Sequence, residues 1–242
     1  MHRSLFITGV HRGLGKATAL MAARRGYAVF GSVRKQEHLE DVAAWQLELE
    51  AEGAAGSLQG VLLDVLDIDR MPQSTRLALE SSDVLINNAG WGAEIDLQSK
   101  MTDTVDQMDE DIFLRAIAIN ATGPRKLMSI ALPRMKERGW GRIVNVSSDR
   151  ACISEIIGQD SIPAYRLSKL ALNGITALAG HENANTGVLI NSLCPGWCKT
   201  DMGGPQAVDT PEQGAERILA LAELDDDGPT GVFFIDGKPF SF

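Results

Sequence analysis

The sequence predicts an α/β fold in which helices cover both faces of a doubly wound parallel sheet. Short apolar runs alternate along the whole chain with longer segments of helical periodicity. Most of these runs are apolar throughout, which is typical of strands buried on both faces. The repeated strand–helix order implies parallel neighbours joined by right-handed crossovers. We expect a single domain over residues 1–242, because no linker, repeat or low-complexity tract divides the chain.

The N-terminal half alternates four expected strands with three expected helices. "SLFITG" is an apolar strand that ends in glycine, and the helix after it carries alanine and leucine on one face. "YAVFGSVR" is the second strand, and the amphipathic helix that follows ends at Gly53. "LQGVLLDV" and "DVLINNAG" are the third and fourth strands. The expected strands span residues 4–9, 27–34, 58–65 and 83–90, and the expected helices 13–26, 36–53 and 67–80.

The C-terminal half continues the same alternation. A long helical segment contains Pro124 and Pro133, and we expect these prolines to kink or interrupt it. "GRIVNVSS", "GVLINSLCPG" and "GVFFID" are the last three strands. The final helix opens with Thr210-Pro211, a capping residue followed by proline at the first helical position. The expected helices span residues 104–138, 163–184 and 211–223, and the expected strands 141–148, 187–196 and 231–236.

Composition excludes several classes of protein. The net charge of −9 argues against nucleic-acid binding. No apolar run is long enough to cross a membrane, and the first residues lack the features of a signal peptide. The sparse cysteines, Cys152, Cys194 and Cys198, suggest reduced thiols, so we expect a cytoplasmic protein. Cys194 and Cys198 lack a second ligand pair at zinc spacing, and we expect no metal site.

A glycine-rich segment, "TGVHRGLG", joins the first strand to the first helix. Such a turn lets the backbone approach a pyrophosphate, and the free N–H groups of the helix terminus then face the phosphates. A tight structural turn is the alternative. If the turn binds the pyrophosphate of a dinucleotide cofactor, the residues expected to hold it here are Gly9, Arg12, Gly13, Leu14 and Gly15.

The end of the second strand favours NADP(H) over NAD(H). An acidic residue at this point would bind the ribose hydroxyl of NAD, whereas the sequence reads "GSVRK". Arg34, Lys35 and the nearby Arg12 would suit a 2′-phosphate. Alternatively, Arg34 and Lys35 are exposed loop charges.

Tyr165 and Lys169 are four residues apart in "AYRLSKLALNG", which has helical periodicity. A lysine ammonium held near a phenol favours the phenolate and lowers the tyrosine pKa, which makes a proton donor and acceptor usable near neutral pH. An isolated pair of this kind is more often an ordinary surface pair. Whether Tyr165 and Lys169 form a catalytic pair or a surface pair therefore depends on the other motifs of the chain.

These motifs occur in a definite order. The glycine turn is followed by "LLDVLD", "NNAG", "AINATGP", "GRIVNVSS", the Tyr165–Lys169 pair and "CPGWCKTDM". In this order, over essentially the whole chain, the sequence resembles the short-chain dehydrogenase/reductase family, and its C-terminal part resembles the carbonyl-reductase-like branch. The resemblance implies a Rossmann fold and reversible hydride transfer between NADP(H) and a ketone or aldehyde.

The resemblance also implies roles for single residues. Tyr165 would be the acid/base, Lys169 would tune it and bind the nicotinamide ribose, Ser148 would hold the substrate oxygen, and Asn120 would position a proton-relaying water at a helix irregularity. Asp64 and Val65 would contact the adenine. The remaining cofactor contacts would be Arg34 at the adenosine end, Asn88, Ala89 and Gly90, and then Pro195, Gly196, Trp197, Cys198 and Thr200 around the nicotinamide.

Two positions depart from the family pattern. The stretch from Ser148 to Tyr165 is longer than usual, so the serine could instead be Ser147, although Ser148 is favoured. Cys198 stands where an aliphatic residue is usual, and its thiol would be the most oxidation-sensitive. The short segment between Met202 and Thr210 suggests an open site for bulky or varied carbonyls. Trp91, Trp197, Met202 and residues 156–162 are the candidate residues of the substrate pocket.

Other classes of protein fit less well. An enoyl reductase would have its tyrosine and lysine further apart, and an extended epimerase would need a longer chain. The alternative from another class is a catalytically silent dinucleotide-binding regulatory or signalling protein, which would not need all four catalytic residues. A small-molecule carbonyl or alcohol substrate and a homodimer or homotetramer are implied by the resemblance.

Overall fold

The computed structural model describes residues 3–92, 104–156 and 162–240, and its centre is an eight-stranded sheet with the order β3-β2-β1-β4-β5-β6-β7-β8. Neighbouring strands are parallel except for β7 and β8. The strands are β1 (Ser4–Thr8), β2 (Ala28–Val33), β3 (Ser57–Leu62), β4 (Val84–Asn87), β5 (Gly141–Val146), β6 (Val188–Cys194), β7 (Phe233–Ile235) and β8 (Lys238–Phe240). The predicted doubly wound α/β fold is confirmed.

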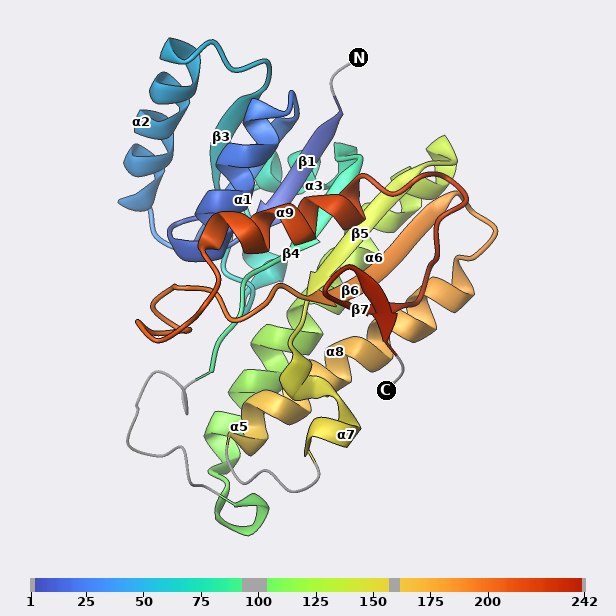
Figure 1. Cartoon of the computed structure of the whole chain (residues 1–242). Helices are drawn as coiled ribbons and strands as arrows, with labels where there is room; N and C mark the ends of the chain where they lie inside the picture. The colour runs from blue at the N-terminus through green and yellow to red at the C-terminus, as the bar shows by residue number, and fades with distance from the viewer. Residues whose placement is uncertain (1–2, 93–103, 157–161, 241–242) are drawn as a thin grey trace.

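Helices cover both faces of this sheet, as Figure 1 shows. The sheet has a hydrophobic core on each face, and successive side chains of β1 point into opposite cores. Leu5 and Ile7 pack with α1, α2 and α9, whereas Phe6 packs with α3, α6 and α8. The helices are α1 (Gly13–Arg24), α2 (His38–Ala51), α3 (Gln73–Ser81), α5 (Glu110–Ile117), α6 (Gly123–Arg138), α7 (Ile153–Ile156), α8 (Pro163–Glu182) and α9 (Pro211–Ala222). Within the described parts of the chain, no helix is long and apolar enough to span a membrane.

The long helical segment before β5 is interrupted, but not at its prolines. A π-helical turn, Ala118–Thr122, separates α5 from α6, while Pro124 occupies the first turn of α6 and Pro133 lies inside that helix. A π turn of this kind widens the helix locally and is frequent at functional sites. The predicted interruption is therefore confirmed, but its place was wrong.

Two further elements differ from the predictions. The helix expected over residues 67–80 is divided at Pro72 into a 3₁₀ turn, Ile68–Arg70, and α3. The strand β8 was not predicted. Asp236 and Gly237, both with positive φ, reverse the chain between β7 and β8. Asp-Gly is the sequence typical of a two-residue hairpin turn, so this signal was present in the sequence.

The strand order indicates which end of the sheet binds ligands. The chain moves outward from β1 through β2 to β3 and then returns to the other side of β1 as β4. Ligands of doubly wound sheets bind at such a switch point, beyond the carboxyl ends of the strands. The segments that follow β1, β4, β5 and β6 therefore lie at this ligand-binding end of the sheet.

Candidate active site

The segment after β1 is a tight glycine turn. Gly9 and Gly13 have positive φ, which side chains rarely adopt. A Cβ on Gly15 would overlap the carbonyl oxygen of Gly9. No side chain caps the N-terminus of α1 at Arg12, and no acidic residue lies in the first turn of that helix. The N–H groups of the first turn are thus available to an anionic ligand, which is the arrangement that a pyrophosphate requires.

The segment after β4 is fastened to this glycine turn. The Thr8 hydroxyl accepts hydrogen bonds from the backbone N–H groups of Asn88 and Ala89, at 3.0 and 2.9 Å. The Asn88 side-chain amide donates to the carbonyl oxygens of Thr8 and Gly9, at 2.8 and 3.1 Å. Asn88 and Ala89 therefore lie beside the turn as expected. Thr8, which sequence reasoning did not single out, holds the two segments together.

Several cations lie around the glycine turn and the end of β2. Arg12 forms an exposed ion pair with Asp201, and Lys35 forms one with Glu37 at 3.0 Å. Arg34 is exposed and forms no ion pair with any residue that the structure describes. Burial is the main cause of the lowered pKa of His11, whose neighbours include Arg12 and Lys35. Arg34 is thus the cation most readily available to a phosphate group.

Tyr165 and Ser148 meet between α8 and the end of β5. Both residues are buried, and the two hydroxyl groups share a hydrogen bond. The Ser147 hydroxyl instead points to the carbonyl oxygen of Lys169, at 3.5 Å. The geometry therefore supports Ser148, rather than Ser147, as the serine that faces the tyrosine.

Burial raises the pKa of Tyr165 well above its ordinary value, while the hydrogen bond with Ser148 lowers it by a smaller amount. Lys169 was expected to lower the pKa of Tyr165, but in the chain alone this pKa is raised. The Lys169 Nζ lies 5.8 Å from the centroid of the phenol ring, and loss of water from the buried phenolate outweighs its influence.

Lys169 itself is buried on α8, one helical turn after Tyr165. Its Nζ donates a hydrogen bond to the carbonyl oxygen of Val146, at 2.8 Å. Burial lowers the pKa of Lys169 to about 8. A Cβ added to Gly90 would lie 3.4 Å from the Lys169 Nζ and 3.5 Å from the Asn120 Oδ1. The segment after β4 therefore passes directly over this lysine.

Asn120 lies in the π turn between α5 and α6, which confirms the expected helix irregularity. Its side chain is fully buried and held from both sides. The Oδ1 accepts from the backbone N–H of Trp91 at 2.8 Å, and the Nδ2 donates to the carbonyl oxygen of Trp91 and to the Ser168 hydroxyl, at 2.7 and 2.9 Å. Asn120 therefore joins the segment after β4 to α8, next to Lys169.

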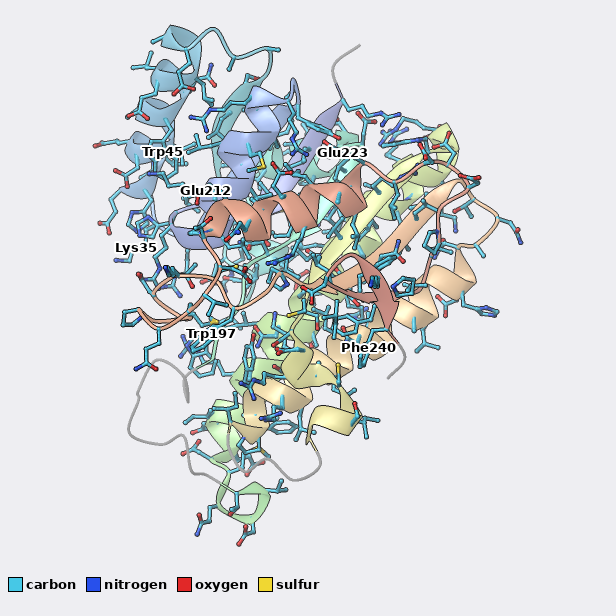
Figure 2. All side chains as sticks on the ribbon, viewed as in Figure 1. Lys35, Trp45, Trp197, Glu212, Glu223 and Phe240 are labelled. Atoms are coloured by element: carbon cyan, nitrogen blue, oxygen red, sulfur yellow. The ribbon has the colours of Figure 1, made fainter. Side chains whose placement is uncertain are left out.

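The segment after β6 closes the site from the other side. A Cβ on Gly13 would lie 3.1 Å from the Thr200 methyl group, so this segment touches the glycine turn. Gly196 has a φ of 90° beside Arg217, whose guanidinium donates to the carbonyl oxygen of Pro195 at 2.7 Å. Trp197 is about half exposed and lies below the N-terminus of α9 (Figure 2).

The expectation that Cys198 is the most oxidation-sensitive thiol does not agree with its surroundings. The Cys198 side chain is buried, and burial raises its pKa. Its Sγ points to the carbonyl oxygen of Pro195 at 3.5 Å. Reactive cysteines are accessible and have lowered pKa values, so Cys198 is a structural thiol here.

The end of β3 contributes the residues expected to meet the adenine. The Asp64 Oδ1 accepts a hydrogen bond from the backbone N–H of Leu66 at 2.9 Å, which fixes a turn. Val65 packs against Gly123, the first residue of α6. Of the candidate substrate-pocket residues, Trp91, Trp197 and Met202 are described, whereas residues 157–161 of the segment 156–162 lie outside the described residues.

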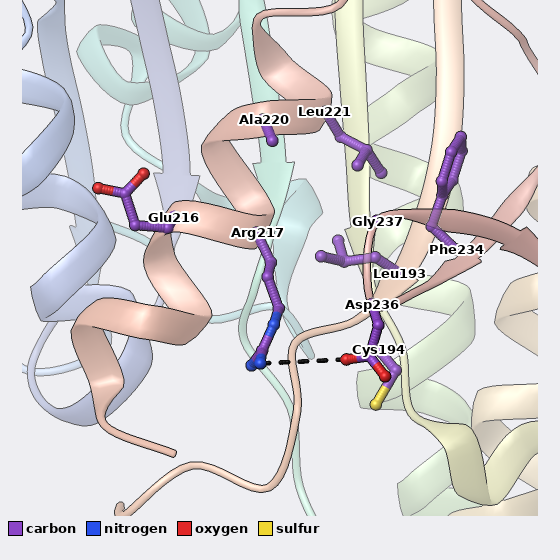
Figure 3. Close-up of a pocket in the computed structure, with 9 residues that line it drawn as sticks. All are labelled: Leu193, Cys194, Glu216, Arg217, Ala220, Leu221, Phe234, Asp236 and Gly237. Carbon is purple, nitrogen blue, oxygen red and sulfur yellow. Dashed lines mark ion pairs between the residues drawn. The ribbon is translucent and has the colours of Figure 1, made fainter.

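A separate cavity of about 450 Å³ lies between α9 and the strands β6 and β7 (Figure 3). Arg217 and Asp236 face each other across it at 4.0 Å, among apolar side chains such as Phe234. None of Asn120, Ser148, Tyr165 and Lys169 lines this cavity. We therefore take the cluster of Asn120, Ser148, Tyr165 and Lys169 at the carboxyl ends of β4 and β5 as the candidate active site, and not this cavity.

The fold is thus a doubly wound α/β sheet with a buried serine, tyrosine and lysine beyond the carboxyl ends of its strands. The family profile described as short chain dehydrogenase matches residues 3–210, and the chain belongs to this family. It is 29% identical to carbonyl reductase (NADPH) 1 of Oryctolagus cuniculus, with 98% of this chain and 97% of that protein covered. It is also 29% identical to a 3-oxoacyl-(acyl-carrier-protein) reductase of Thermotoga maritima, with 90% and 81% covered.

Solved structures give the same relationship. An NADPH-bound carbonyl reductase from chicken fatty liver superposes with a TM-score of 0.80 at 25% identity, covering 100% of this chain and 99% of that one. Carbonyl reductase Sniffer of D. melanogaster has a TM-score of 0.81 at 23% identity, with both chains fully covered, and supports the fold. The expected resemblance to the carbonyl-reductase-like branch is confirmed.

Proposed function

We propose that this protein reduces a ketone or an aldehyde to an alcohol with NADPH. The observation that carries the proposal is the meeting of Ser148, Tyr165 and Lys169 with Asn120 at the carboxyl ends of β4 and β5. All four side chains are buried, although Asn120, Ser148 and Lys169 belong to residue types that are mostly exposed. Such burial of polar and charged groups is frequent at functional sites.

The preference for NADPH rests on the charges around the glycine turn. The turn fits a pyrophosphate, because its glycines leave room for the phosphates and the first N–H groups of α1 are uncapped. Arg34 and Arg12 would hold the 2′-phosphate, and for Arg12 this means exchanging Asp201 for the phosphate. The relatives named as NADPH carbonyl reductases support the same choice.

In this proposal NADPH supplies the hydride, and the protein's own groups handle the oxygen. The Ser148 hydroxyl donates a hydrogen bond to the carbonyl oxygen and stabilises the negative charge that develops there. Tyr165 then gives its proton to that oxygen. The raised pKa of Tyr165 keeps the phenol protonated at neutral pH, so the site is poised as a proton donor for reduction.

Lys169 and Asn120 complete the proton path. A lysine with a pKa of about 8 can release and take up a proton near neutral pH. It would return a proton to the Tyr165 phenolate after each turnover. The Asn120 side chain, held by Trp91 and Ser168, fixes the π turn beside Lys169, where a relaying water would bind.

The test compares the two tyrosines of the chain. NADPH oxidation is followed with a panel of aliphatic and aromatic ketones and aldehydes, using Tyr165→Phe and, as a matched control, Tyr27→Phe in the apolar core. We expect Tyr165→Phe to lose at least about 100-fold in kcat, and Tyr27→Phe to keep it. NADPH binding without turnover of any carbonyl by the unaltered protein would favour the silent regulatory alternative.

The assembly is a further part of the proposal. We expect a homodimer or homotetramer that packs α5, α6 and α8 against a second copy. Leu114 on α5 and Leu178 on α8 are 55% and 65% exposed and would offer apolar surface to such a contact. Light scattering during size-exclusion chromatography measures the mass, and a monomer at micromolar concentration would contradict this part alone.

A further inference from the structure

Two histidines that are far apart in the sequence lie against each other beside the glycine turn. His11 belongs to the turn itself, and His38 is the first residue of α2. Their rings stack with centroids 3.4 Å apart and planes inclined by 26°. Asp41 lies three residues after His38 on the same helix face, and its Oδ2 is 3.5 Å from the His38 Nδ1.

These three side chains bring potential ligand atoms close together. One nitrogen of each histidine and one oxygen of Asp41 all lie within 4.8 Å of one another. The His11 Nδ1 is buried and has no hydrogen-bond partner among the residues that the structure describes. A buried ring nitrogen without a partner is costly, unless a ligand that the site can hold supplies the missing bond.

We propose that His11, His38 and Asp41 bind a divalent transition-metal ion such as Zn²⁺. Two imidazoles and one carboxylate form a ligand set that suits this ion, and a fourth position would stay open to water or to an anion. Ligand atoms around tetrahedral zinc lie about 3.4 Å apart, so the three groups must approach one another by up to about 1.4 Å. Because an imidazole binds a metal through a lone pair in its ring plane, one of the two rings must also turn out of the stacked arrangement. Asp41 is half exposed and free to turn its carboxylate inward.

The charged side chains around the three proposed ligands determine how tightly a metal ion would bind. Glu37, whose Oε1 is 3.8 Å from the His38 Nε2, adds a second carboxylate nearby, while Arg12 and Lys35 oppose a further positive charge. The mixed charges predict moderate rather than very tight binding. A bound ion would tie the N-terminus of α2 to the glycine turn and thereby add a positive charge next to Arg34 and Arg12.

The experiment uses the full chain without a histidine tag, stripped of metal by a chelator. Zn²⁺ is titrated by calorimetry and Co²⁺ by visible absorption, in the absence of any dinucleotide. The chain offers a matched pair of double variants, since it has four histidines. His11→Gln/His38→Gln removes the proposed ligands, and His2→Gln/His181→Gln removes the other two.

We expect one ion per chain, affinity at least about tenfold weaker in His11→Gln/His38→Gln, and unchanged affinity in the control pair. The Co²⁺ spectrum should lack a thiolate charge-transfer band. If the double variant fails to fold, Asp41→Asn, which alters a half-exposed side chain, should weaken binding at least about threefold. Absence of binding, unchanged affinity in the ligand variants, or a thiolate band would each overturn the proposal.

Discussion

Arg34 should discriminate between the two nicotinamide dinucleotides, and Arg34→Ala tests this. Arg34 follows β2 directly and is exposed, and within the described ranges no acidic side chain pairs with it. Its removal therefore costs the folded chain little. Any loss of binding then reports a contact with the dinucleotide rather than damage to the fold.

The size of the effect follows from the kind of contact. A hydrogen bond between an arginine and a phosphate contributes about 1.5–3 kcal/mol, which is about 10- to 150-fold in Kd. NADPH binding should weaken by this factor, whereas NADH, which lacks the 2′-phosphate, should bind as before. Lys35→Ala is the control, because Lys35 is already paired with Glu37 and should change NADPH binding by less than about fivefold.

The assay is quenching of tryptophan fluorescence on titration with NADPH and, separately, with NADH. Trp197 lies half exposed in the segment after β6 and should report the nicotinamide end of either ligand. Equal weakening of both ligands by Arg34→Ala would refute a specific phosphate contact. Unchanged NADPH binding would refute the role of Arg34 altogether, while leaving the reductase proposal intact.

Three further predictions concern the catalytic groups and the buried charges. Ser148→Ala should lower kcat about 100-fold, and Ser147→Ala by less than about tenfold, because Ser148 shares a hydrogen bond with the Tyr165 hydroxyl whereas the Ser147 hydroxyl points to the carbonyl oxygen of Lys169. Equal losses in steady-state kinetics would contradict the assignment. Arg142 is fully buried and donates two hydrogen bonds to the carbonyl oxygen of Leu224, at 2.8 and 3.0 Å. Arg142→Met should therefore lower the free energy of unfolding by about 3 kcal/mol and the Tm by about 6–12 °C. The control, Arg76→Met on the surface, should shift the Tm by less than about 2 °C. A calorimetric shift as small as that of the control would exclude a structural role for Arg142. Because the pKa of Lys169 is lowered to about 8 in the fold, the unfolded chain binds more protons between pH 8 and 10, so stability should rise by at most about 3 kcal/mol over that window. Urea unfolding of Lys169→Met should show a smaller rise, and an equal rise would show that another group causes it.

Much of the fold could be predicted from local pattern, since each strand from β1 to β7 lies in a short, largely apolar run and the first helix begins at the glycine turn. The misses have local causes. Pro72 divides one expected helix, because proline removes a backbone donor and restricts the residue before it. The hairpin of β7 and β8 depends on Asp236-Gly237, a turn signal that the strand pattern alone did not include.

For the candidate site, the sequence predicted which residues take part but not the contacts that hold them. Motif order identified Asn120, Ser148, Tyr165 and Lys169, but it could not say how each is held. Thr8 and Ser168 act through hydrogen bonds to residues distant in sequence, and the pairing of His11 with His38 depends on the packing of α2 beside the glycine turn. The direction of the Tyr165 pKa shift also required structure, because burial opposes the lysine that the spacing suggested.

The π turn at Ala118–Thr122 fixes the rotational phase of two helices. Each residue of an α-helix turns the chain by about 100°, so one residue more or less before Gly123 would rotate the whole of α6 by that angle. Leu127 and Met128 now face the sheet, and such a rotation would turn them away from it. The widened turn that presents Asn120 to the site is therefore also what keeps the apolar face of α6 in register with the strands.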